Sequence, residues 1–197
     1  MNPLNNHRQS LILGIVIALI LAVVMAGWPL AVSGPSLARW FHIVSGVFWI
    51  GLLYYFNVAQ TPALSEAAAD KGGPGGAGIT KYVAPRALFW FRWAALATWL
   101  GGAWLLKENF LNAFTFRSGF VVIGIGAWLG TIMLLNVWGV IWPNQKKILG
   151  IKAATDAEKA QARKIAGMAS RVNFVLSIPM LMCMAAQSHG LPFFHSG

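Results

Sequence analysis

Two histidines, His42 and His189, have the residue type and the placement to ligate a metal inside a membrane. His42 lies in the apolar run RWFHIVSGVFWIG, residues 39–51, and His189 follows a second apolar run near the C-terminus. An ionisable residue within such a run is a candidate functional residue. Two imidazoles at one membrane depth form the minimal arrangement for axial ligation of a b-type haem. The two positions therefore raise the hypothesis of a haem site whose iron is held by His42 and His189.

The residues near His42 extend this hypothesis. Gly46 lies four residues after His42, so both share one face of a helix, where the missing side chain would open a slot for a porphyrin plane. Trp49 follows at the next turn and would form the floor of the pocket. Arg39 lies at the outer edge, where it would pair with haem propionates. The predicted cofactor-binding residues are therefore His42, His189, Gly46, Trp49 and Arg39.

Each of these residues also has a structural interpretation. An interfacial histidine often serves as a hydrated polar anchor, and Gly46 would equally serve helix–helix packing. His189 suits the C-terminal end of a helix, where a cation interacts favourably with the macrodipole. A His–Met pair is another ligand possibility, although methionines in apolar runs commonly fill the core. The methionines in question are Met180, Met182 and Met184.

The composition indicates which elements must position these residues. The 197-residue chain is 57% hydrophobic and only 10% charged, whereas soluble domains carry about 25% charged residues. We therefore expect an all-α integral membrane protein, a single membrane domain over residues 1–197, with five transmembrane helices, of which helices two to five form a four-helix bundle. The expected spans are about 11–32, 38–59, 86–106, 117–142 and 168–189.

The basic residues predict the orientation. With a cytoplasmic N-terminus, eleven Lys and Arg residues fall in inner segments, three in outer segments, and Arg92 lies within a span. This bias obeys the positive-inside rule, so we expect the N-terminus inside and the C-terminus outside. The same explanation accounts for the net charge of +10 and makes nucleic acid an unsuitable partner. In this orientation His42 and His189 lie near the same outer surface of the membrane.

Local signals predict one long last helix. Thr155 and Glu158 have the spacing of a capping box, and strong helix formers follow without interruption. We expect a helix from about Asp156 to His189, with residues 156–170 as a cytoplasmic extension and a kink at Pro179.

A second set of polar residues falls at a similar, inner depth on four of the expected helices. Placing an arginine in the hydrocarbon core costs roughly several kcal/mol of free energy unless it forms polar contacts or its side chain reaches the interface. We therefore expect Arg92 to face the bundle interior and to use neighbouring amides. The layer is explained either as hydrogen-bonded glue between helices or as a small-molecule, quinone or proton site. Its members are Arg92, Asn57, Asn136 and Asn173.

Longer blocks of sequence resemble a known family. The second to fifth expected helices resemble the membrane part of the cytochrome-c-linked bacterial urate hydroxylase family. This family is also called the urate oxidase N-terminal domain family. The blocks are RWFHIVSGVFWIGLLYYFNVAQTPAL, APRALFWFRWAALATWLGGAWLL, NVWGVIWPNQKKILG and ASRVNFVLSIPMLMCM.

The resemblance implies a multi-pass redox protein of the bacterial inner membrane that passes electrons to a cytochrome c. Many family members carry a C-terminal cytochrome c domain, whereas this sequence has one cysteine and no C-x-x-C-H motif. Any haem c is therefore expected on a separate protein. We expect haem b as cofactor and an oxidoreductase-like role, with urate hydroxylation as one form of it. The alternative is a non-catalytic accessory subunit of a larger respiratory or monooxygenase membrane complex.

Overall fold

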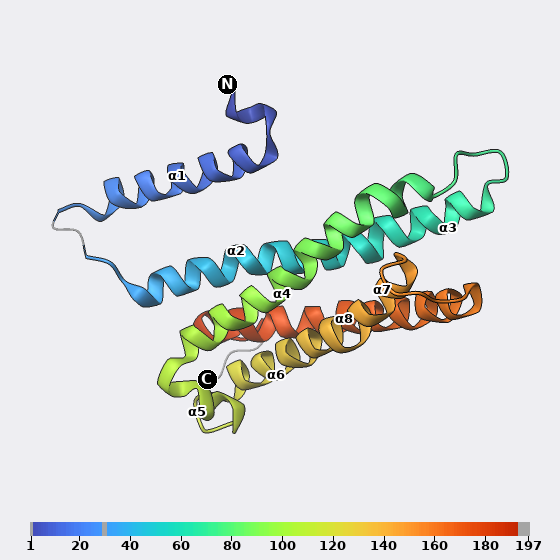
Figure 1. Cartoon of the computed structure of the whole chain (residues 1–197). Coiled ribbons are helices and arrows are strands. Elements are labelled where there is room, and N and C mark those ends of the chain that lie inside the picture. Colours follow the sequence, from blue (N-terminus) through green and yellow to red (C-terminus); the bar gives the residue numbers. More distant parts are fainter. Residues whose placement is uncertain (1, 29–30, 193–197) are drawn as a thin grey trace. The chain divides into compact units, whose positions relative to one another are not determined.

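The structure is a computed structural model that describes residues 2–28 and 31–192, and within these residues every regular element is helical. The expected all-α fold is therefore confirmed. The chain divides into two compact units, residues 1–34 and 35–197, and Figure 1 colours it along the sequence. The helices are α1 (His7–Ala26), α2 (Gly34–Tyr54), α3 (Thr61–Ala69), α4 (Ala84–Leu106), α5 (Phe110–Phe114), α6 (Val121–Asn136), α7 (Trp142–Ile148) and α8 (Asp156–His189), with short 3₁₀ turns at Pro3–Asn5 and Lys107–Asn109.

The first unit consists mainly of α1. Its N-terminus is capped by the Asn6 side chain, which accepts a hydrogen bond of 2.9 Å from the backbone N–H of Arg8. The helix ends at Ala26 because Gly27 adopts a φ of 71°, a conformation typical of helix termination. No residue of α1 is buried within the protein, and a helix that is apolar on all sides suits a lipid environment. Residues 29 and 30 of the predicted span 11–32 lie outside the described residues.

Three of the long helices are interrupted by π-helical segments: Tyr55–Gln60 joins α2 to α3, Ile79–Val83 precedes α4, and Val137–Ile141 joins α6 to α7. A proline follows each segment at the second residue of the next helix, as Pro62, Pro85 and Pro143. A proline ring clashes with the carbonyl four residues earlier and donates no hydrogen bond. The wider π turn relieves this clash, and the helix continues beyond the proline.

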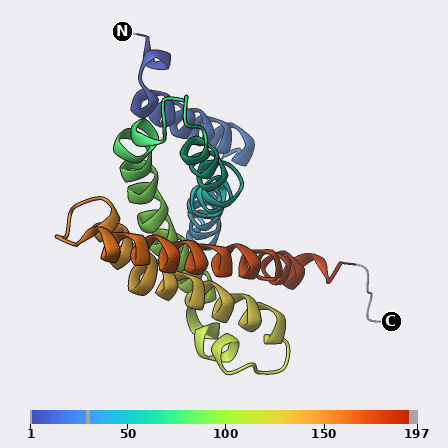
Figure 2. The same cartoon turned by 90° about the vertical axis from the view of Figure 1, so that its right-hand side faces the viewer.

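Four helices contribute to the core of the second unit. In both views α6 lies along α8, and Figure 2 shows this pair crossing α2 and α4. The fully or nearly fully buried side chains at the centre are large and apolar, which suits a bundle core. They include Trp49 and Leu53 from α2, Phe91 from α4, Met133 from α6 and Met180 from α8.

The glycines of the fourth predicted helix have different roles. A Cβ atom at Gly126 would lie 3.0 Å from Cβ of Cys183, so this glycine permits the close approach of α6 and α8. A Cβ atom at Gly124 would overlap the backbone carbonyl of Ala113 in α5. Gly130 has open space around its Cα, and Gly119 occupies a turn with a φ of 81°. Gly124 and Gly126 therefore permit α6 to approach α5 and α8 closely.

The helices agree with a multi-pass membrane protein. Within the described part of the chain, four helices are long and apolar enough to cross a membrane: 7–26, 34–69, 121–148 and 156–189. The expected span at 86–106 corresponds to α4, which does not reach this hydropathy because Arg92 and several tryptophans interrupt it. The short helix α5, which the sequence did not indicate, packs on α6 through the hydrogen bond from Trp128 Nε1 to the Phe114 carbonyl, 3.0 Å.

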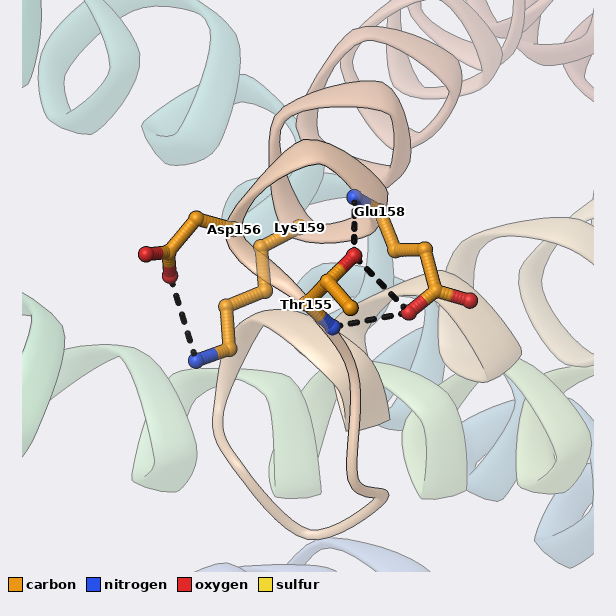
Figure 3. A network of polar contacts seen from close by, with 4 residues as sticks. All are labelled: Thr155, Asp156, Glu158 and Lys159. Carbon is orange, nitrogen blue, oxygen red and sulfur yellow. Dashed lines mark hydrogen bonds and ion pairs between the residues drawn. The ribbon is translucent and has the colours of Figure 1, made fainter.

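The last helix has the predicted bounds, Asp156–His189, and Pro179 lies inside it. Figure 3 shows its capping box: Thr155 N–H donates to Glu158 Oε2 at 2.7 Å, and Glu158 N–H donates to Thr155 Oγ1 at 3.2 Å. The hydrogen bond from the Thr155 backbone, with help from its hydroxyl, lowers the pKa of the Glu158 carboxyl. A lowered carboxyl pKa means that this capping contribution is complete above the ordinary value of 4.5 and is lost as the pH falls through the lowered value.

Replacing Thr155 with alanine is expected to destabilise the first turns of α8 by about 1 kcal/mol, because the amide of Glu158 loses its acceptor. Hydrogen exchange at residues 156–160 should accelerate accordingly. The control is Ser65→Ala, since the Ser65 hydroxyl bonds only to a carbonyl of its own helix, Thr61, at 3.1 Å. Unchanged exchange in the Thr155 variant would show that the cap does not hold this end of the helix.

Candidate functional site

An apolar cavity of about 540 Å³ lies within the second unit, between α2, α4, α5, α6 and α8. Its volume falls in the range of about 300–1,000 Å³ that is usual for sites that bind small molecules and cofactors. Of the predicted cofactor-binding residues, His42, Gly46 and Trp49 line this cavity. The spacing of four and seven residues therefore brings these three side-chain positions to one wall, as expected.

His42 is held by a backbone carbonyl of the neighbouring helix. Its Nδ1 lies 2.7 Å from the carbonyl oxygen of Thr98 in α4. A carbonyl oxygen can only accept a hydrogen bond, so Nδ1 carries the proton and, in the neutral ring, Nε2 keeps its lone pair. No residue in the described ranges forms a hydrogen bond with Nε2. This is the arrangement by which proteins fix the tautomer and the orientation of a metal-ligating histidine.

Two further glycines, Gly101 and Gly102, allow His42 to reach this carbonyl, and sequence reasoning missed them. A Cβ atom at Gly101 would lie 3.2 Å from His42 Cα, and one at Gly102 would lie 3.1 Å from His42 Cε1. Gly102 is four residues after Thr98, on the turn that would otherwise cover the Thr98 carbonyl. The double glycine in WLGGAW was the available signal, but a partner helix had to be known before it could be assigned to His42.

Gly46 leaves free space beside the cavity, whereas Trp49 is a buried side chain that fills space at its wall. A Cβ atom at Gly46 would meet only Cγ2 of Thr98, at 3.7 Å, so the glycine leaves space toward the cavity. Trp49 is only 2% exposed, and its Nε1 is buried without a hydrogen-bond partner in the described part of the chain. Trp49 is therefore a buried residue of the cavity lining.

The other two predicted cofactor-binding residues do not line the cavity. Arg39 is exposed in the first turns of α2, three residues before His42, and His189 is exposed as the last residue of α8. The structure thus does not bring His189 to the cavity wall that holds His42. Two other residues of α8, Met180 and Met184, do line the cavity. These thioethers belong to the His–Met alternative that the sequence left open.

The predicted inner polar layer consists largely of hydrogen bonds between helices. Asn173 is fully buried; its Nδ2 donates to the Met133 carbonyl at 3.0 Å, and its Oδ1 accepts from Asn136 Nδ2 at 2.7 Å. Asn57 Nδ2 donates to Ser170 Oγ at 2.9 Å, which joins the helix of α2 to α8. The three asparagines therefore hold the helices together by hydrogen bonds. This is the first of the two explanations given for the polar layer.

Arg92 does not join this amide network. No hydrogen bond connects its guanidinium to another residue of the described ranges. The guanidinium carbon lies over the Trp142 ring, 3.9 Å from the centroid, and 5.2 Å from the centroid of Phe89. The expectation that Arg92 uses the neighbouring amides is wrong, because its guanidinium instead makes a cation–π contact with Trp142 of α7.

Replacing Asn173 with alanine is expected to lower the stability of the protein in detergent by about 1–2 kcal/mol, because Met133 loses a donor and Asn136 loses an acceptor. Thermal or denaturant unfolding measures the loss. Asn144→Ala is the matched control, since the Asn144 amide bonds only to the Val140 carbonyl of its own helix. Equal losses in the two variants would contradict the role of Asn173 between helices.

The fold and the site together define a helical, multi-pass type of membrane protein whose cavity is bordered by one oriented imidazole. Residues 107–196 match the model of the family described as Urate oxidase N-terminal, so this part of the chain is similar to that family. The matched range contains Met180, Met184 and Asn173, whereas His42 and its glycine partners precede it. Comparison with curated proteins and with solved structures gave no significant match.

Proposed function

We propose that the chain is an integral membrane redox protein that binds haem b in the cavity beside His42 and exchanges electrons with a cytochrome c. The observation that carries the proposal is the hydrogen bond of 2.7 Å from His42 Nδ1 to the Thr98 carbonyl at the edge of an apolar cavity of about 540 Å³. The similarity of residues 107–196 to the Urate oxidase N-terminal family supports a relation to urate hydroxylase.

The residues of the cavity fit a haem. Its walls are almost entirely apolar, which suits the porphyrin, and Gly46 leaves room next to the imidazole. The Nε2 lone pair of His42 would supply one axial ligand. Met180 and Met184, which also line the cavity, would provide thioethers for a second, and His189 would need to reach the cavity from the end of α8. When bound, the haem iron supplies one-electron oxidation and reduction.

The orientation is part of the proposal. We place five spans in a bacterial inner membrane with the N-terminus inside and the C-terminus outside, because basic residues concentrate on one side. The cavity then lies toward the outer surface, since it is lined by residues 42–51 of the long helix 34–69, by the last turns of α4 and by part of α5. A soluble cytochrome c on that side would reach a haem held there.

One optical measurement tests the cofactor. Protein purified in mild detergent, after expression with an adequate haem supply, is expected to show a Soret band that shifts on reduction with dithionite, together with iron. Absence of both the band and iron would refute haem binding. Rapid reoxidation of the reduced protein by a soluble cytochrome c would support the electron-transfer step, and urate-dependent reduction of cytochrome c would extend the proposal to urate hydroxylation.

The second candidate function is a non-catalytic accessory subunit of a larger respiratory or monooxygenase membrane complex. The observation that favours it is a set of tryptophans with large exposed surfaces on the second unit. Tryptophans anchor membrane interfaces but are also enriched in protein contacts. Co-purification with large subunits and without haem would favour this function over the first. The tryptophans are Trp40, Trp90, Trp93, Trp104 and Trp128.

A further inference from the structure

Two cationic side chains converge on one tryptophan, Trp142, at the start of α7. The Arg92 guanidinium carbon, from α4, lies 3.9 Å from the centroid of the Trp142 ring. Lys146 Nζ, one turn after Trp142, lies 6.0 Å from the same centroid. Both cations are only partly buried, as is the indole. The result is a cluster, Arg92–Trp142–Lys146, with two positive charges on one aromatic ring.

No acidic residue in the described part of the chain forms an ion pair with this cluster. Within the described residues the only ion pair joins Lys159 to Asp156, at 3.7 Å. The chain has five acidic residues, and α4, α6 and α7 contain none of them. Two positive charges at partial burial therefore lack a counter-charge from the protein, a situation that favours binding of an external anion.

The guanidinium also keeps its hydrogen-bonding edge free. A guanidinium that lies over an indole uses its face, and its five N–H donors point outward in the plane. No hydrogen bond occupies these donors in the part of the chain that the structure describes. Arg92 can therefore donate two parallel hydrogen bonds to a phosphate while it remains over Trp142. Lys146 would add a second, flexible charge from the neighbouring helix.

We propose that the Arg92–Trp142–Lys146 cluster binds the phosphate of an anionic phospholipid headgroup. Trp142 and Lys146 lie near the end of the long apolar helix 121–148, where headgroups meet the protein. Tryptophans prefer this level of a membrane, and basic pockets between spanning helices recognise anionic headgroups there. The proposal does not depend on haem binding, and the cluster lies outside the residues that line the cavity.

Native mass spectrometry of the full chain in a neutral detergent tests this site. The protein is titrated with phosphatidylglycerol and, separately, with phosphatidylcholine. We expect preferential binding of phosphatidylglycerol and about fivefold weaker binding in Arg92→Gln and in Lys146→Gln, since one basic residue contributes about that factor. Lys147→Gln is the matched control, because it removes the same charge one residue further along the chain. The charge of Lys147 acts on the Glu158 carboxylate.

Three results would overturn the proposal. Equal binding of the two lipids would remove the anion preference, and an equal loss in Lys147→Gln would remove the cluster as its source. Displacement of phosphatidylglycerol by millimolar inorganic phosphate would identify a site for soluble anions instead of a lipid site. Gel filtration and far-UV circular dichroism check the fold, and if Arg92→Gln does not fold, the comparison of Lys146→Gln with Lys147→Gln alone decides the outcome.

Discussion

Purified protein in which His42 is replaced by alanine is expected to lose the Soret band that we propose for the wild type. The substitution removes the only imidazole that lines the cavity among the described residues, and loss of an axial ligand releases a b-type haem that has no covalent attachment. The measurement is the absorbance of haem per protein, checked by iron content, after identical purification of both proteins.

Two variants show whether the effect depends on the orientation of His42. Thr98→Val keeps the backbone carbonyl that accepts from His42 and removes only the hydroxyl, which bonds to Ala94 within its own helix; haem content should persist. Gly102→Ala pushes on the His42 ring and should weaken haem retention by about 10- to 100-fold, as is usual for partners that orient a ligand. Full haem in the His42 variant would contradict the assignment of this residue as ligand.

Replacing Gly124 with alanine is expected to have the largest effect on stability of any single methyl addition in α6. The added Cβ would overlap the Ala113 carbonyl, a backbone atom of α5 that a rotamer change cannot move aside. Overpacking of this kind costs roughly 1–3 kcal/mol. The midpoint of thermal unfolding in detergent, with the yield of monodisperse protein, measures the loss.

Gly130→Ala provides the comparison for this variant. Gly130 lies in the same helix, and no heavy atom beyond its chain neighbours and the backbone of its own helix lies within 4 Å of the position that its Cβ would take. Alanine also has a higher helix propensity than glycine, by about 1 kcal/mol, so this variant should be as stable as the wild type or more stable. A Gly124 variant as stable as the Gly130 variant would show that α5 does not pack on α6 as described.

Local sequence patterns predicted those structural features that depend only on residues close together in the chain. Thr155 and Glu158 fixed the start of α8, because a capping box needs only residues within one turn. The apolar runs located the long helices, since a run of about 20 apolar residues is the length that a helix needs to cross a bilayer. The spacing of His42, Gly46 and Trp49 predicted a shared wall, because residues four and seven apart share one helical face.

Features that depend on the rotation of one helix about its axis relative to another could not be predicted. Equal depth in the membrane suggested that His189 meets His42, but depth does not determine which way a side chain faces, and His189 is exposed at the end of α8. Arg92 was assigned to the amides for the same reason, and it lies on Trp142. The Thr98 carbonyl carries no sequence signal, because every residue has a backbone carbonyl group.

The hydrogen bond from His42 to the Thr98 carbonyl makes the imidazole a direct link between α2 and α4. The ring is attached covalently to α2 through Cγ, and the adjacent Nδ1 is held by a hydrogen bond to α4. A translation of either helix along its axis must therefore tilt the ring and turn Nε2 away from its former direction. Mechanical strain between these two helices, from a docked partner or from a change in bilayer thickness, would thus act directly on the electronics of any metal bound at that nitrogen.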